Sequence, residues 1–245
     1  NPLWMRYCAI SPDGTTIAFT YKGDIYTVPS TGGRASQITT NPAHDTKPIW
    51  SPDGKKIAFA SDRMGSMDIF EVNKEGGIPK RLTTHSGNET PVAYKDAGHI
   101  LFLANIMPTA EDAQFPSGQF QQVYEVNTEG GRPILFSSMP MEDISINHTG
   151  NTLLYHDKKG YEDPWRKHHT SSITRDIWLC SLNGNRTFRK QTAFNGEDRT
   201  PVWASDDKSF YYLSEEKGSF NIFKRDIDGN TSKQITNHTK HPVRF

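Results

Sequence analysis

The sequence predicts an all-β fold, a β-propeller of four-stranded antiparallel blades, and two observations carry this prediction. One set of short motifs recurs five times in the same order along the 245 residues. The 19 glycines and 15 prolines are spread over the whole chain, which favours short strands joined by tight turns. Radially packed blades cover both faces of each sheet. A sandwich is the alternative all-β fold, but it would not need units that resemble one another.

The first motif is a turn. Ser11-Pro12-Asp13-Gly14 recurs unchanged as Ser51-Pro52-Asp53-Gly54, and weaker copies begin at Lys95, Asn147 and Ser205. Proline presets such a turn, and Asp-Gly tolerates positive φ. The starts of the copies are 40, 44, 52 and 58 residues apart. This spacing matches a four-stranded blade, whereas leucine-rich and ankyrin repeats are shorter and contain helices.

Two apolar runs follow each turn and predict two strands of each blade. Alternation of apolar and polar residues in these runs buries one side of each strand. The first runs are Ile17–Phe19, Ile57–Phe59, Ile100–Phe102, Leu153–Tyr155 and Phe210–Tyr212, and the second are Asp24–Tyr26, Asp68–Phe70, Gln122–Tyr124, Asp176–Trp178 and Asn221–Phe223.

A glycine turn and a short last strand complete each unit, as in Gly32-Gly33 followed by Gln37-Ile38-Thr39. The repeats predict one propeller domain over residues 1–245, with blades at about 1–43, 44–87, 88–140, 141–196 and 197–240. The segment Thr239–Phe245 aligns with Arg199–Trp203 and predicts the first strand of a sixth blade at 241–245. We therefore expect a truncated six- or seven-bladed propeller.

Composition limits the partners. The 28 Lys and Arg residues balance the 28 Asp and Glu residues, so the chain lacks the basic excess of a nucleic-acid-binding protein. No apolar run approaches the roughly 18 residues of a membrane span, so we expect no membrane insertion. The two cysteines, Cys8 and Cys180, fall in different predicted blades. We expect buried free thiols at both positions.

The repeat resembles the TolB-like propeller repeat, also called the WD40-like or PD40 repeat. The best copy runs from Lys47-Pro48-Ile49-Trp50-Ser51-Pro52-Asp53-Gly54 to Ile57-Ala58-Phe59 and on to Asp68-Ile69-Phe70. The segment 160–178, from Gly160-Tyr161-Glu162-Asp163-Pro164-Trp165 to Asp176-Ile177-Trp178, is similar to an insertion in the first propeller of tricorn-type serine peptidases of the S41 type. This resemblance implies a second propeller, a PDZ-like domain and a catalytic core further along the parent protein, and a periplasmic or otherwise extracytoplasmic location.

Two long insertions are predicted between the second and third strands of their blades, at Asn105–Gln121 and Asp157–Arg175. Long loops on a rigid scaffold often carry binding functions. We expect the two insertions to stand side by side over one face, where they dock another domain, contact a ligand or have no function. The candidate binding residues in them are Phe115, Trp165, Arg166, His168 and His169.

Acidic residues precede each predicted first strand. Asp45, Glu89, Asp143 and Asp198 would surround an axial channel, where they could attract a peptide N-terminus or a cation. The simpler interpretation, which we favour, is that they cap turns and pair across blades with Arg199 and Lys47.

Nothing in the sequence indicates catalysis by this chain. His168-His169 and Ser171-Ser172 are neighbours in sequence, which is no evidence for a triad. The chain contains no G-x-S-x-G elbow and no H-E-x-x-H motif, so we expect no catalytic residue, metal or cofactor. The resemblance implies a non-catalytic propeller that filters or channels peptides or docks other domains or subunits of a peptidase. The alternative is a TolB-like periplasmic module that binds proteins.

Overall fold

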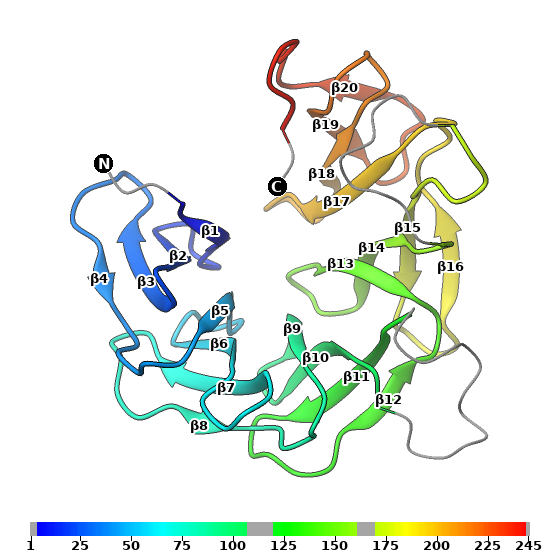
Figure 1. Cartoon of the computed structure of the whole chain (residues 1–245). Coiled ribbons are helices and arrows are strands. Elements are labelled where there is room, and N and C mark those ends of the chain that lie inside the picture. Colours follow the sequence, from blue (N-terminus) through cyan, green and yellow to red (C-terminus); the bar gives the residue numbers. More distant parts are fainter. Residues whose placement is uncertain (1–3, 107–119, 161–169, 244–245) are drawn as a thin grey trace. The chain divides into compact units, whose positions relative to one another are not determined.

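The computed structural model describes residues 4–106, 120–160 and 170–243, and these form five four-stranded antiparallel sheets with no helix in the described ranges (Figure 1). Each sheet is one blade, and its strands pair in chain order. The all-β propeller with five blades is thus confirmed. The strands divide between two compact units, Asn1–Met139 and Pro140–Phe245, which are described separately.

The first unit contains three blades. Blade one is β1 (Arg6–Ile10), β2 (Thr16–Tyr21), β3 (Asp24–Pro29) and β4 (Ser36–Gln37). Blade two is β5 (Asp45–Trp50), β6 (Lys56–Ser61), β7 (Asp68–Asn73) and β8 (Lys80–Arg81). Blade three is β9 (Thr90–Asp96), β10 (His99–Ala104), β11 (Gln122–Asn127) and β12 (Ile134–Ser137).

The second unit contains two blades. Blade four is β13 (Met141–Ile146), β14 (Thr152–Asp157), β15 (Ile177–Ser181) and β16 (Thr187–Lys190). Blade five is β17 (Asp198–Trp203), β18 (Ser209–Ser214), β19 (Asn221–Asp226) and β20 (Ser232–Gln234). The predicted apolar runs therefore form the second and third strands, and the two long insertions connect β10 to β11 and β14 to β15.

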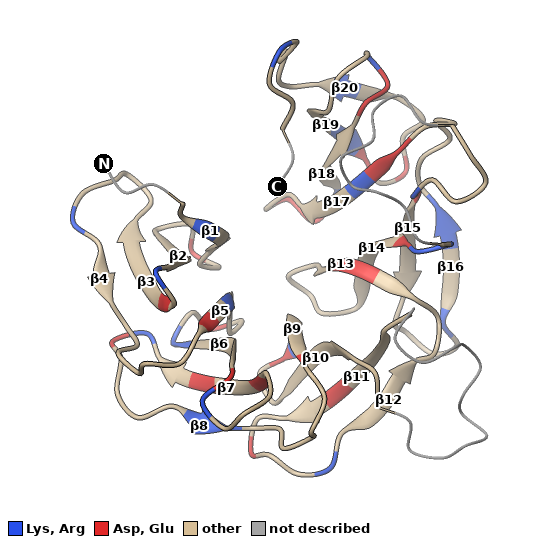
Figure 2. Ribbon diagram, viewed as in Figure 1, with Lys and Arg blue, Asp and Glu red and all other residues tan. Residues whose placement is uncertain are grey.

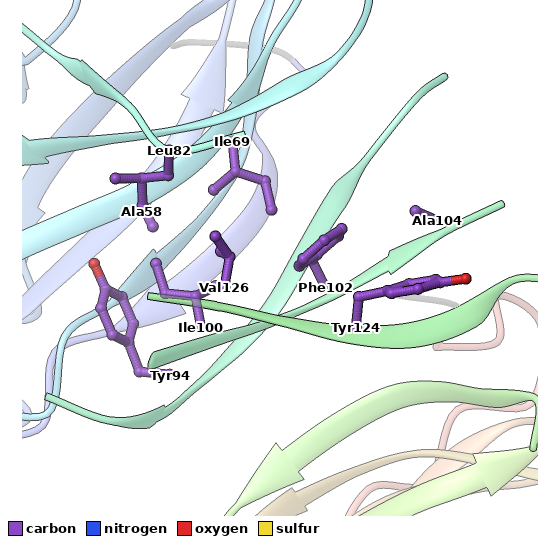
Figure 3. Packing of buried hydrophobic residues seen from close by; sticks show 9 residues of the cluster. All are labelled: Ala58, Ile69, Leu82, Tyr94, Ile100, Phe102, Ala104, Tyr124 and Val126. Carbon is purple, nitrogen blue, oxygen red and sulfur yellow. The ribbon is translucent and has the colours of Figure 1, made fainter. Parts of the chain in front are cut away.

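Apolar side chains from facing sheets form the core between blades. Between blades two and three, Ala58, Ile69 and Leu82 pack against Ile100, Phe102 and other residues of the next sheet (Figure 3). The next residues along the same strands, Ile57, Phe59 and Phe70, face the other way and pack on blade one. Because side chains alternate along a strand, one blade buries both faces, and its second strand reads as a continuous apolar run.

In four blades a threonine hydroxyl accepts a backbone hydrogen bond from the third strand. The Oγ atoms of Thr39, Thr83, Thr192 and Thr236 accept the backbone N–H of Ile25, Ile69, Ile177 and Ile222 at 3.0, 2.9, 3.1 and 2.9 Å. Each threonine follows the short fourth strand, where the ladder of backbone hydrogen bonds has ended. The side chain therefore replaces a strand partner for a donor that would otherwise be buried and unpaired.

Two expectations change. Cys180 is buried and free, but Cys8 lies in the exposed stretch Arg6–Cys8 of β1; the prediction of a buried thiol at Cys8 was wrong. No strand is assigned to the described residues 241–243. Val243 nevertheless donates its N–H to the carbonyl of Phe220 at 3.0 Å, in the way that Asp45 donates to Gly23 before the first strand of blade two. The sixth blade stays a prediction.

Replacement of Thr83 by valine tests the contribution of the threonine hydroxyl to stability. Thr83→Val keeps the shape but leaves the N–H of Ile69 without its acceptor, and an unpaired buried donor costs about 1–3 kcal/mol. We expect the free energy of unfolding, measured in urea, to fall by about that amount. Thr83→Ser retains the hydroxyl and serves as the control. A loss in Thr83→Val no larger than that in Thr83→Ser would contradict the role of the hydroxyl.

Candidate functional site: the first strands and the links between blades

The first strands of four blades share a bulge at one position. In β1, β5, β13 and β17 the pairing with the second strand shifts by one extra residue. The extra segment contains a residue other than glycine with positive φ: Tyr7 (54°), Lys47 (52°), Asp143 (49°) and Thr200 (53°). Bulges of this kind re-aim a side chain out of the regular alternation.

The bulge conformation is energetically unfavourable. Residues in the left-handed region cost of the order of 1–3 kcal/mol each, and a β-branched residue such as Thr200 is a strong outlier there. Aspartate tolerates the region better than the other three types. Such strain persists only where the surrounding structure imposes it, and it is concentrated at functional sites. The repetition of the strain in four blades marks these positions as candidates for function.

Bulge residues of consecutive blades contact each other. In the first unit the Nζ atom of Lys47 lies 5.6 Å from the ring centroid of Tyr7, a cation–π arrangement. In the second unit the hydroxyl of Thr200 donates to Oδ2 of Asp143 at 2.8 Å. We call Tyr7 with Lys47 the first bulge pair, and Asp143 with Thr200 the second. Tyr7 is 48% exposed and the Asp143 side chain is 50% exposed, so both pairs reach solvent.

The second bulge pair rests on a buried histidine. The backbone N–H of Thr200 donates to Nδ1 of His156 at 3.2 Å, so Nε2 carries the ring proton in the neutral form. Nε2 lies 3.3 Å from Oε2 of Glu142. His156 is only 3% exposed. The imidazole thus joins blade four to the bulge of blade five.

Charged groups surround Glu142 at the base of the β14–β15 connection. Lys158 donates to Oε1 of Glu142 at 2.6 Å, and the Nε of Arg175 lies 3.7 Å from Oε2. Arg175 also donates to Glu197 at 2.7 Å. Burial raises the pKa of Glu142, but hydrogen bonds from His156 and Lys158 outweigh it and lower the pKa to about 2. Glu142 is therefore an anion that fixes the ends of this connection to the first strand β13.

Three of the predicted carboxylates are buried in the links between blades. Asp45 and Glu89 are 0% exposed and Asp198 is 1% exposed. Their backbone N–H groups donate to the carbonyls of Gly23, Met67 and Arg175 of the preceding blade at 2.7, 2.7 and 3.1 Å. Asp143 alone presents its carboxylate to solvent. In Figure 2 acidic residues appear on β13, and both charges appear on β17. A binding role for all four residues stays a prediction.

The structure changes part of the simpler interpretation, in which these acids pair across blades with Arg199 and Lys47. Arg199 Nη1 lies 3.6 Å from Glu197, two residues before it in the same link, and its pairing across blades stays a prediction. Asp45, however, is held by Arg63, whose Nη2 lies 2.9 Å from both carboxylate oxygens, and Lys47 stacks on Tyr7 instead. The sequence contained no signal for the bulges, since neither lysine nor threonine favours positive φ.

The other predicted binding residues, Phe115, Trp165, Arg166, His168 and His169, lie outside the described residues. Ser171 and Ser172 are described, and Ser171 Oγ accepts the N–H of Ile173 in a local turn at 3.2 Å. Within residues 4–106, 120–160 and 170–243, no group of three His, Cys, Asp or Glu side chains could hold a metal ion. No described helix is long and apolar enough to cross a membrane.

Comparison with known proteins identifies relatives along the whole chain. Tricorn protease homolog 1 of Streptomyces coelicolor is 25% identical over 236 residues, which cover 96% of this chain and 21% of the relative. The crystal structure of the tricorn protease superposes with a TM-score of 0.76 and 21% identity, covering 100% of this chain and 23% of that one. A putative TolB from Agrobacterium tumefaciens superposes with a TM-score of 0.73 at 14% identity, covering 96% and 81%.

The chain thus spans about a fifth of the length of its tricorn relatives. The likeness to the solved structures shows the propeller fold. A family model, the tricorn protease N-terminal β-propeller domain, matches residues 2–245, and the chain belongs to this family.

Proposed function

We propose that this propeller guides peptides for a tricorn-like peptidase and contributes no catalytic group itself. The observation that carries the proposal is the pair of exposed bulge contacts on the first strands, Tyr7 with Lys47 and Asp143 with Thr200. Each pair places a charged group beside an uncharged polar or aromatic one, at a backbone position that costs energy to keep. Such mixed surfaces suit extended peptides of varied sequence.

The two bulge pairs have opposite charge, and each selects its own class of peptide. Lys47, stacked on the exposed ring of Tyr7, favours acidic side chains. Asp143, whose carboxylate is oriented by the hydroxyl of Thr200, favours basic side chains and the peptide N-terminus. Docking of other domains or subunits of the parent protein is the second part of the proposal. The polar network around Glu142 supports it, because it fixes both ends of the β14–β15 connection.

A sixth blade belongs to the same proposal. The face of blade five that corresponds to Ile49, Ala58 and Leu82 of blade two consists of Val202, Tyr211 and Ile235, which are 51%, 36% and 48% exposed. In blade two this face is covered by blade three. An apolar sheet face of this kind fits another blade. We also propose an extracytoplasmic location, which rests on family resemblance. The alternative function, from which peptide guiding has to be distinguished, is a TolB-like protein-binding role.

Peptide binding is testable with fluorescently labelled octapeptides and fluorescence anisotropy. We expect Lys47→Ala to weaken binding of acidic peptides and Asp143→Asn to weaken binding of basic peptides, each by about tenfold, the effect of losing ~1.4 kcal/mol. Asparagine tolerates the positive φ at position 143. Lys22→Ala is the matched control, because Lys22 also has positive φ and stacks on a tyrosine, Tyr21, but lies outside the first strands.

Unchanged affinities in both bulge variants would contradict peptide guiding. Binding of a folded protein partner with no binding of peptides would favour the TolB-like alternative.

Lack of catalysis is tested by incubating the purified chain with a peptide library and analysing the products by mass spectrometry. We expect no cleavage, because the family resemblance implies that the catalytic core of the parent protein lies outside this propeller. Cleavage that persists after removal of contaminating peptidases would overturn the proposal, and its loss in His156→Gln would assign the activity to this chain.

The sixth blade is tested in the gene. We expect the reading frame after Phe245 to continue with another turn motif and apolar run of the kind seen at Ser51–Phe59. A natural stop codon directly after Phe245 would exclude it.

A further inference from the structure

The links between consecutive blades carry a buried acid at one shared position, but only one of these acids has a cation of its own. Asp45, Glu89 and Asp198 each donate a backbone N–H to the preceding blade. Asp45 is met by Arg63, which lies two residues after the end of β6 and whose guanidinium also lies over Phe70, 4.6 Å from its centroid. This junction, between blades one and two, is a buried ion pair.

The position of Arg63 is occupied differently in blades three and five. Two residues after the end of β10 stands Ile106, and two residues after the end of β18 stands Glu216. An apolar group in one blade and a second carboxylate in the other therefore replace the arginine. Neither can neutralise the acid at the link, so Glu89 and Asp198 are buried without the partner that Asp45 has.

The charged groups around Asp198 are committed elsewhere. Asp176, at the start of the third strand of blade four, is held by Lys159 at 2.5 Å and Lys190 at 2.9 Å. Arg175 is bound to Glu197, and Arg199 lies over the ring of Phe220 at 4.3 Å. Glu216, whose charge also acts on Asp198, lies 3.7 Å from Lys217. Asp198 thus faces carboxylates and hydroxyl groups rather than a free cation.

The burial of Asp198 favours a protonated acid, whereas its hydrogen bonds from Ser214 and Thr192 favour the anion. Burial raises its pKa to about 7, and the hydroxyls of Ser214 and Thr192 oppose this, while Asp176 and Glu216 add to it. Its Oδ1 has no hydrogen-bond partner within the described ranges. A buried carboxylate anion with one unpartnered oxygen is costly, whereas the neutral acid avoids most of that cost.

Glu89, at the junction between blades two and three, is buried in a similar way to Asp198. The charges of Asp68 and Arg81 act on it; the Nη2 of Arg81 itself lies 2.7 Å from Asp68. Burial raises the pKa of Glu89 to about 7; the hydroxyl of Thr83 and the charge of Arg81 lower it, and Asp68 raises it further. His85 is the other titratable group near Asp68.

We propose that the junctions between blades two and three and between blades four and five are closed by a protonated carboxylic acid and loosen when that acid ionises, whereas the junction between blades one and two is closed by the ion pair of Asp45 with Arg63. The proton takes the place that Arg63 fills beside Asp45. Two of the three junctions described by the structure are therefore pH-responsive, and they lie in different units.

The sign of the effect follows from proton linkage. The folded chain binds a proton at Asp198 and at Glu89 up to about pH 7, while the unfolded chain releases it near pH 4. The stabilisation from each proton is complete below about pH 4 and is lost as the pH rises to about 7. For each acid the unfolding equilibrium constant rises about tenfold per pH unit in that window.

Urea unfolding between pH 5 and pH 8 tests the proposal. We expect Asp198→Asn and Glu89→Gln each to remove about a tenfold change per pH unit from the slope and to be more stable than the parent chain at pH 8. Glu216→Arg should recreate the pair of Asp45 with Arg63 and flatten the slope without altering Asp198. Asp45→Asn, the matched control, should lower stability at every pH, because it strands the Arg63 charge, but should leave the slope unchanged.

Carboxyl-carbon NMR of the unmodified chain keeps the test decisive if a variant fails to fold. We expect the Asp198 and Glu89 resonances to remain in the protonated range at pH 6. Titration of both acids below pH 5 would overturn the proposal. So would a pH dependence of stability in Asp198→Asn, Glu89→Gln and Glu216→Arg that equals that of the parent chain.

Discussion

The fold depends on how the backbone is hydrogen-bonded where one blade ends and the next begins. A blade with both faces buried has no solvent available to its link, so each polar group there needs a partner within the protein. Two recurring bonds meet this need: the threonine hydroxyl that accepts a third-strand N–H, and the link N–H that reaches the carbonyl just before that strand. The apolar packing of Figure 3 is possible because these polar groups are already satisfied.

The same constraint explains the distribution of acids. The link passes into the protein interior immediately before the first strand. An acid at that position is therefore buried, whichever group it binds. Asp45 is paired with Arg63. Glu142, on the first strand of blade four, is surrounded by Lys158, His156 and Arg175. Where the chain supplies no such cation, a proton is the remaining means of neutralising the charge. Of the four predicted acids, Asp143 is the one whose carboxylate reaches solvent.

Much of the fold could be predicted from the sequence, and less of the site. The turn at Ser51–Gly54 and the run Ile57–Phe59 predict strands because local turn chemistry and alternation act within a few residues. The bulge at Thr200 is different: β-branched residues avoid positive φ, so the conformation arises from His156 and Asp143, which lie more than 40 residues away in sequence. Arg63 could not be matched to Asp45 for the same reason, since pairing across a blade depends on strand register.

The bulges also have a consequence for how the protein can change over evolutionary time. The energetic cost at positions 7, 47, 143 and 200 depends on the side chain, because aspartate and asparagine tolerate positive φ and β-branched residues do not. Exchanges among residues that tolerate positive φ therefore cost little folding energy while they change what the first strands present to solvent. The propeller can in this way acquire new specificity at a few fixed points without rebuilding its blades.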